Sequence, residues 1–147
     1  MLIVLVVCVV VVFLTTVFHY EVLGTLNERL PSMRIPNRSK LLIVMFVMLI
    51  AHLLEMALWA LAMYGLVEVP GVGTLRGVSP VTFESWMYFS AETYTSLGFG
   101  DVTPSGHMRL LIGLEALNGL LLIAWSASFT YLSMERFWSI RRGAQHP

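Results

Sequence analysis

Three long apolar stretches restrict what this chain can fold into. Residues 2–18, 41–66 and 108–132 contain almost no charged side chains, and a helix needs about 17–25 residues of this kind to cross a membrane. Hydrophobic residues make up 57% of the chain and charged residues 12%, against about 45–50% and about 25% in soluble domains. A water-soluble globule is therefore excluded. We expect an all-α membrane protein with three transmembrane helices.

The first apolar stretch is either a spanning helix or a cleaved signal peptide. A signal peptide has basic residues before its apolar run and small residues at a cleavage site after it. No basic residue precedes residues 2–18, and the bulky residues 18–20 follow them. We therefore expect residues 1–20 to form an uncleaved N-terminal transmembrane helix. His19 and His107 are expected near water at helix ends, without a specific role.

The segment between the second and third apolar stretches cannot span a membrane. Residues 67–80 are rich in glycine and proline, which is typical of an exposed loop. Ser79 and Pro80 are suited to the start of a helix, because serine caps a helix N-terminus and proline fits the first turn. A helix over residues 83–95 is about 20 Å long. It can enter the membrane but not cross it.

The residues after this short helix carry two glycines at alternate positions. They read Thr95-Ser96-Leu97-Gly98-Phe99-Gly100-Asp101. Glycine permits a positive φ, so that consecutive carbonyls can point in one direction. Irregular backbone at membrane depth is tolerated only where it is buried in protein or lines a water-filled path. A row of carbonyls facing such a path is a cation site.

The string TYTSLGFGDVTP, residues 93–104, resembles the filter of the potassium-channel pore family, which reads T-x-G-Y-G-D. The resemblance covers residues 83–132 and, more loosely, the second apolar stretch. It implies an ion-channel pore domain over residues 41–132. The parts of this domain are an outer helix 41–66, a re-entrant pore helix 83–95, a selectivity filter 96–100 and an inner helix 108–132.

The resemblance also implies roles for individual residues through their positions in the family motif. Filter residues are Ser96, Leu97, Gly98, Phe99 and Gly100, directly after Thr95, and K⁺ is expected at Ser96, Leu97, Gly98 and Phe99. Filter support is expected from Glu92 and Asp101, which share a proton or a water in some members, and from Tyr88 and Phe89 of the aromatic cuff. Gly119 matches the hinge glycine of the inner helix, although packing between helices is an equal alternative.

Three filter positions differ from the usual family pattern. Ser96 replaces threonine and keeps its hydroxyl, Leu97 replaces valine, and Phe99 replaces tyrosine and loses its hydroxyl. We expect a K⁺-selective channel rather than an enzyme, with no cofactor besides K⁺ in the filter. The alternatives are a weakly selective monovalent-cation channel, prompted by Ser96 and Phe99, and a nonconducting membrane subunit with the pore fold.

One chain supplies only one filter strand, whereas a ring of carbonyls must surround the ion to replace its hydration shell. The resemblance therefore implies a homotetramer, with membrane lipid and potassium ions as the other partners. The net charge is zero, so nothing suggests a nucleic-acid partner.

Basic residues lie mainly in two segments outside the apolar stretches. Residues 21–40 contain four of the nine basic residues and residues 133–147 contain three, and such residues favour the cytoplasmic side. We expect 21–40 to be a cytoplasmic loop and 133–147 a short cytoplasmic tail. This topology places the N-terminus and the re-entrant segment outside the cell membrane.

Two ionisable residues, His52 and Glu55, lie one turn apart in the second apolar stretch. An ionisable residue at this depth indicates a functional site by default. Three interpretations remain: a structural hydrogen bond between the two or to Ser126 or Asn118, a pH sensor coupled to gating, and a metal site.

Two further polar residues, Glu115 and Asn118, lie one turn apart in the third apolar stretch. Each can face the central cavity and concentrate cations, or face the second stretch as a partner for Glu55. We favour lining of the cavity for Asn118 and packing behind the filter for Glu115.

Overall fold

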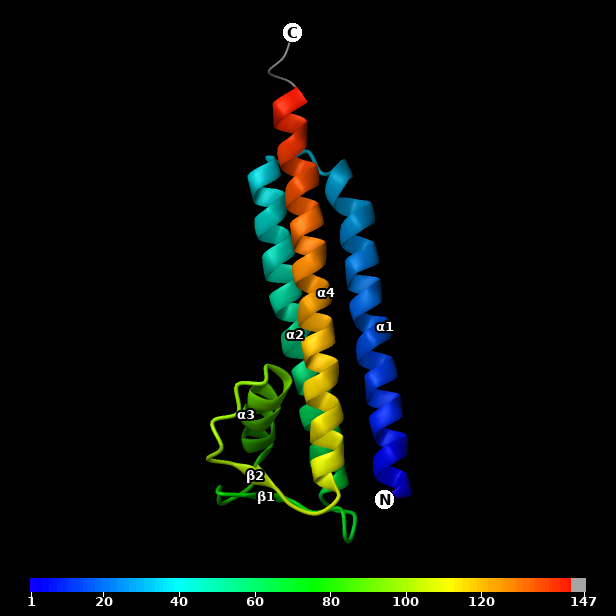
Figure 1. Ribbon diagram of the computed structural model, residues 1–147, viewed down its shortest axis with the longest axis vertical. Coiled ribbons are helices and arrows are strands. Elements are labelled where there is room, and N and C mark those ends of the chain that lie inside the picture. The colour runs from blue at the N-terminus through cyan, green and yellow to red at the C-terminus, as the bar shows by residue number, and fades with distance from the viewer. Residues whose placement is uncertain (144–147) are drawn as a thin grey trace.

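Three long helices and one short helix make up the computed structural model, which describes the backbone of residues 1–143 and the side chains of residues 1–137. The elements in chain order are α1 (Leu2–Ser32), α2 (Asn37–Leu66), β1 (Leu75–Arg76), α3 (Phe83–Tyr94), β2 (Thr103–Pro104) and α4 (Met108–Gly143). The long helices lie side by side, and α3 and the two strands lie at the end that also holds the N-terminus (Figure 1). All three long helices are long and apolar enough to span a membrane.

Helix α1 is longer than the sequence predicts. It continues to Ser32, so the loop expected over residues 21–40 is reduced to residues 33–36. Three leucines of this extension, at spacings of three and four, pack against α2 and α4 in one apolar cluster, whose buried members are Leu23, Leu26, Leu30, Val44, Met48 and Phe137. The apolar face of the extension therefore keeps it helical, despite its charged residues.

Helix α4 also extends beyond its predicted end. It continues to Gly143, through most of the tail expected over residues 133–147, and residues 144–147 lie outside the described part. No proline or glycine interrupts the chain between Gly119 and Gly143. Phe137 is buried, and its carbonyl accepts a hydrogen bond from Asn37 Nδ2 at 2.9 Å. Packing against α2 therefore stabilises this extension.

The short helix α3 begins at Phe83, as predicted, and its N-cap is Thr82 rather than Ser79. Thr82 and Ser85 form a capping box, in which each side chain bonds to the backbone N–H of the other residue. At 12 residues, α3 is about 18 Å long and cannot cross a membrane. One face of it is buried in the main apolar core, together with residues of α1, α2 and α4.

The loop before α3 is held against residues 101–105. Strands β1 and β2 pair antiparallel, and a Cβ at Gly73 or Gly77 would collide with the backbone carbonyl of Ser105 or Asp101. Both glycines have a positive φ, so they satisfy the turn and the close approach together. The loop before α3, named the outer loop below, is thus fastened to residues 101–105.

Candidate functional site

The residues after α3 form a strand with an alternating backbone. Ser96, Gly98 and Gly100 have φ angles of +58°, +55° and +81°, whereas Leu97 and Phe99 do not have a positive φ. Alternation between left- and right-handed backbone turns successive peptide planes so that carbonyls face one side and N–H groups the other. Ser96 adopts the left-handed conformation although it has a Cβ, which is uncommon for an ordinary residue.

Hydrogen bonds hold the N–H side of this strand against the end of α3. The backbone N–H groups of Leu97 and Gly98 both donate to the carbonyl of Glu92, at 2.9 and 3.3 Å, and that of Ser96 donates to the carbonyl of Thr93 at 3.0 Å. Within the described part of the chain, no carbonyl of residues 96–100 accepts a hydrogen bond. These carbonyls are therefore available to a cation.

The strand lies on the surface of the single chain. Residues 95–101 are all exposed, and the large apolar side chains of Leu97 and Phe99 are 60% and 66% exposed. Thr95 is held by its hydroxyl, which donates to the carbonyl of Ala91 at 2.6 Å.

A tyrosine of α3 ties the helix to the residue after the strand. The hydroxyl of Tyr88 donates to Asp101 Oδ2 at 3.1 Å, and the carboxylates of Glu92 and Asp101 raise the pKa of Tyr88 above its ordinary value. No direct hydrogen bond joins Glu92 to Asp101 in the described residues, where Asp101 is bonded to Tyr88 instead. A proton or water shared by the two carboxyl groups stays a prediction. The Glu92 side chain is buried, and its Oε1 has no hydrogen-bond partner in the described residues.

Two residues of α3 face the interior of the chain. Phe89 is buried in the main apolar core, so it anchors α3 to the other helices. Ser90 donates one hydrogen bond to the carbonyl of Met56 at 2.9 Å and contacts Glu115 Oε1 at 2.5 Å. Glu115 therefore packs against α3 in the interior of the chain.

Asn118 does not line a cavity. It is buried and donates a hydrogen bond from Nδ2 to the hydroxyl of Thr15 at 2.8 Å. Thr15 lies on α1, so the side of α4 that carries Asn118 is covered by the first helix. The expectation that Asn118 lines the cavity failed because it did not consider a polar residue of α1 as the partner of Asn118.

Gly119 permits a close contact between α4 and the end of α3. A Cβ at this position would overlap the backbone carbonyl of Tyr94 and press against its side chain. Gly113, on the same helix, has no atom within 4 Å of such a Cβ. Gly119 thus has a packing role, and the hinge function stays a prediction.

A buried polar cluster lies behind the end of α3. Glu55 Oε1 lies 2.8 Å from His19 Nδ1, and Glu55 Oε2 lies 3.0 Å from His52 Nδ1 and accepts a hydrogen bond from the Tyr94 hydroxyl. On the other side of both rings, Ser126 Oγ lies 3.1 Å from His19 Nε2 and 3.0 Å from His52 Nε2. The cluster therefore joins all four helices.

The position of His19 corrects the expectation that it lies near water without a role. It is fully buried, because α1 does not end at residue 20 and packs against α2 and α4 along its length. The sequence contained a signal for the role of His19, because an ionisable residue inside a spanning helix indicates a function. This rule was not applied to His19, because the first helix was predicted to end at residue 20, one residue beyond it.

Ligand atoms of His19, His52 and Glu55 lie within 4.8 Å of one another. Each of these atoms already has a hydrogen-bond partner within the protein. We therefore interpret the group as a hydrogen-bonded cluster and not as a metal centre.

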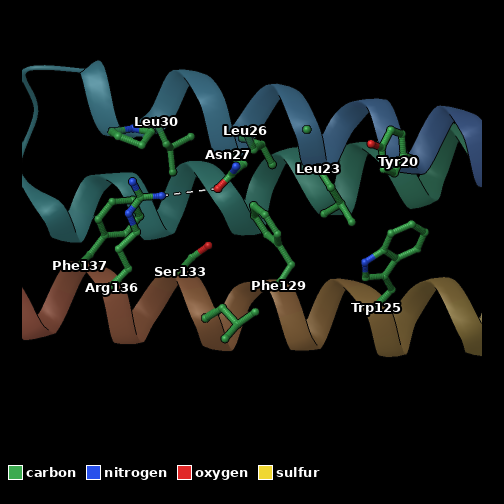
Figure 2. A pocket seen from close by; sticks show the side chains of 13 residues that line it. Tyr20, Leu23, Leu26, Asn27, Leu30, Trp125, Phe129, Ser133, Arg136 and Phe137 are labelled. Carbon is green, nitrogen blue, oxygen red and sulfur yellow. Dashed lines mark hydrogen bonds between the residues drawn. The ribbon is translucent and has the colours of Figure 1, made fainter.

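A groove of about 470 Å³ lies between α1 and α4 (Figure 2), and no residue of 95–101 lines it. Aromatic and aliphatic side chains form its walls, and at one end Arg136 donates to Asn27 Oδ1 at 3.5 Å. At the other end, the ring of Trp125 lies 5.6 Å from that of His19. The groove thus ends beside the polar cluster.

Comparison with protein families finds one match. A family model described as an ion channel matches residues 40–135, which include the filter strand, α3, most of α2 and the greater part of α4, and leave α1 outside. No match was found among curated proteins or among solved structures. The matched region corresponds to the pore domain that the sequence motif indicates, and the three apolar helices make the chain a multi-pass membrane protein. The chain therefore belongs to the ion-channel family whose two-span pore domain is of the potassium-channel kind.

Proposed function

We propose that this protein is a potassium-selective channel that conducts K⁺ passively through a filter formed by residues 96–100. The observation that carries the proposal is the alternating backbone of this strand. The N–H groups of Ser96, Leu97 and Gly98 bond to the end of α3, and the carbonyls of residues 96–100 accept no hydrogen bond within the described residues. Carbonyl oxygens arranged in this way replace the hydration shell of a potassium ion.

Four copies of the chain complete the proposed filter. One strand lines one side of an ion path, and a ring of carbonyls requires several. The exposure of Leu97 and Phe99 on the single chain supports burial against neighbouring copies, because large apolar side chains beside an ion path are otherwise left in water.

Phe99 lacks the tyrosine hydroxyl of the usual filter, but other contacts of this chain make the proposed filter rigid, and this rigidity supports selectivity. The bond from Tyr88 to Asp101 fastens the exit of the filter to α3, and the glycine contacts of the outer loop fasten it from the other side. A filter whose exit is fastened on two sides, and whose base is bonded to α3, favours one ion size over another more strongly than a mobile one. This favours K⁺ selectivity over the weakly selective alternative.

Charge distribution supports an orientation with the filter outside the cell membrane. The turn between α1 and α2 and the end of α4 lie opposite α3 (Figure 1). Arg29, Arg34, Arg38 and Lys40 occur around this turn, and basic residues favour the cytoplasmic side.

Reconstitution into liposomes tests the proposal. With a tenfold K⁺ gradient balanced by Na⁺, a K⁺-selective pore gives a reversal potential of about 59 mV in magnitude. A weakly selective cation pore gives a value near zero, and a nonconducting subunit gives no current. Either of the last two results would contradict the proposal, and purified protein that runs as a monomer would contradict the tetramer.

A further inference from the structure

The buried polar cluster contains more hydrogen-bond contacts than available protons when Glu55 is ionised and the other side chains are neutral. The difference is one proton. The cluster has five contacts: three to the Glu55 carboxylate, from His19, His52 and Tyr94, and two to Ser126, from the same histidines. Each contact needs one proton between its two heavy atoms.

Proton supply depends on the charge of the cluster. With Glu55 ionised and both histidines neutral, the two rings, the phenol and the serine hydroxyl provide one proton each. Four protons cannot fill five contacts. A fifth proton, on Glu55 or on either ring, fills all of them and brings the net charge of the cluster to zero.

Two additional contacts do not change this count. His52 Nδ1 also lies 3.0 Å from the Tyr94 hydroxyl oxygen, and its one N–H is shared between the two oxygens. Ser126 Oγ lies 3.4 Å from the sulfur of Met48, but a thioether is a weak acceptor. The serine proton is therefore used better by an imidazole nitrogen.

The surroundings favour the neutral, fully bonded state. His19 and Glu55 are completely buried, where a net charge and an unmade hydrogen bond are both unfavourable. The neighbouring buried acids provide no compensation. Glu115 of α4 contacts Ser90, and no hydrogen bond joins Glu92 of α3 to the cluster in the described residues.

We propose that His19, His52, Glu55 and Ser126 form a binding site for one proton, and that this proton holds the filter in its conducting form. The second part rests on the proposed channel function. Tyr94 is the last residue of α3, and the filter strand follows it directly. Loss of the proton leaves one contact of the cluster unmade, and the Glu55 carboxylate that binds the Tyr94 hydroxyl is then held less firmly. Channel current therefore falls as the pH rises.

Glu55→Gln distinguishes this proposal from a merely structural cluster. The amide of a glutamine can donate to His19 Nδ1 while its oxygen accepts from His52 and Tyr94, and His19 then donates to Ser126, which donates to His52. All five contacts are filled without a titrating proton. His107→Gln is the matched control, because His107 is exposed directly before α4.

Two measurements from about pH 5 to about pH 9, a range that brackets the ordinary histidine pKa of about 6.5, test the site. We expect the wild-type current in liposomes to fall by about tenfold towards high pH, the effect of one unmade buried hydrogen bond, and the Tm of the purified protein to fall in parallel. The His107→Gln variant follows the wild type. In Glu55→Gln both dependences disappear.

Failure of the site and failure of the channel function are distinguishable in this design. If the wild type gives no current, conduction is refuted. If the Tm of the wild type nevertheless depends on pH and that of Glu55→Gln does not, the proton site is supported. A wild type with constant Tm and current refutes the site. Wild-type pH dependence that persists in Glu55→Gln, or is lost in His107→Gln, also refutes it.

Discussion

The hydroxyl of Tyr94 donates a hydrogen bond to the carboxylate of Glu55, and this contact joins the end of the pore helix to the middle of the outer helix. Both residues are buried. The segment proposed as the filter follows Tyr94 directly, so we expect a side chain deep in α2 to affect how firmly the base of this segment is held.

Tyr94→Phe removes this hydrogen bond and keeps the ring. Because the Glu55 carboxylate then lacks one buried donor, we expect a loss of stability of about 1–3 kcal/mol and a lower open probability. Thermal unfolding in detergent and single-channel recording measure the two effects. Tyr131→Phe is the control, since Tyr131 is 60% exposed and makes no hydrogen bond through its hydroxyl in the described structure. Equal Tm values for the two variants would contradict the importance of the contact.

Gly98→Ala is expected to abolish selective K⁺ current. Gly98 has a φ of +55°, a conformation that alanine adopts only at a cost of about 1–2 kcal/mol, and the alternation of the strand requires it. Gly24→Ala in α1 is the matched control, because a Cβ there meets no atom within 4 Å. Reversal potentials under a K⁺/Na⁺ gradient measure the effect. Wild-type selectivity in Gly98→Ala would show that the filter is elsewhere.

Gly119→Ala is expected to destabilise the protein, whereas Gly113→Ala on the same helix is not. A Cβ at Gly119 overlaps the backbone of Tyr94, and a Cβ at Gly113 meets nothing within 4 Å. Overpacking of this kind costs about 1–3 kcal/mol. Thermal unfolding of the two variants measures the difference. If both melt together, α3 and α4 are not in contact at Tyr94.

Asn118→Ala is expected to lower stability without a change in single-channel conductance. Asn118 bonds to Thr15 on α1, and a polar contact between membrane helices contributes about 0.6 kcal/mol on average. Conductance stays constant because the side chain does not face the ion path. A reduced conductance with unchanged stability would show that the Asn118 side chain lines the central cavity after all.

Tyr88→Phe is expected to weaken K⁺ selectivity, because it releases Asp101 from α3. The pKa of Tyr88 is raised by the carboxylates of Glu92 and Asp101, so its folded pKa lies above the ordinary value of about 10. The contribution of this bond is therefore complete below that pH and is lost only as the pH rises through the higher folded pKa. Between about pH 5 and about pH 9, Tyr88 stays protonated, so we expect it to cause no change with pH in the reversal potential of the wild type. A Tyr88→Phe channel as selective as the wild type would show that the tie is dispensable.

Several parts of the fold follow from local sequence patterns. The number of long helices, the short helix between the second and third, and the family of the pore domain are predicted by apolar length, by the positions of glycine and proline, and by one motif. Each of these signals lies within a single segment. The ends of α1 and α4 were wrong because the charged residues there suggested loops, while apolar contacts between helices keep them helical.

The sequence by itself determined the apolar length of each span and the glycine spacing that permits an alternating filter strand. Only the tertiary structure decided which polar groups meet inside the bundle. His19 and Glu55 are 36 residues apart in the chain, and Asn118 meets Thr15 rather than a water-filled cavity. Such contacts depend on how the helices rotate and slide against one another as they pack, and no periodicity within one helix specifies the rotation of its neighbour.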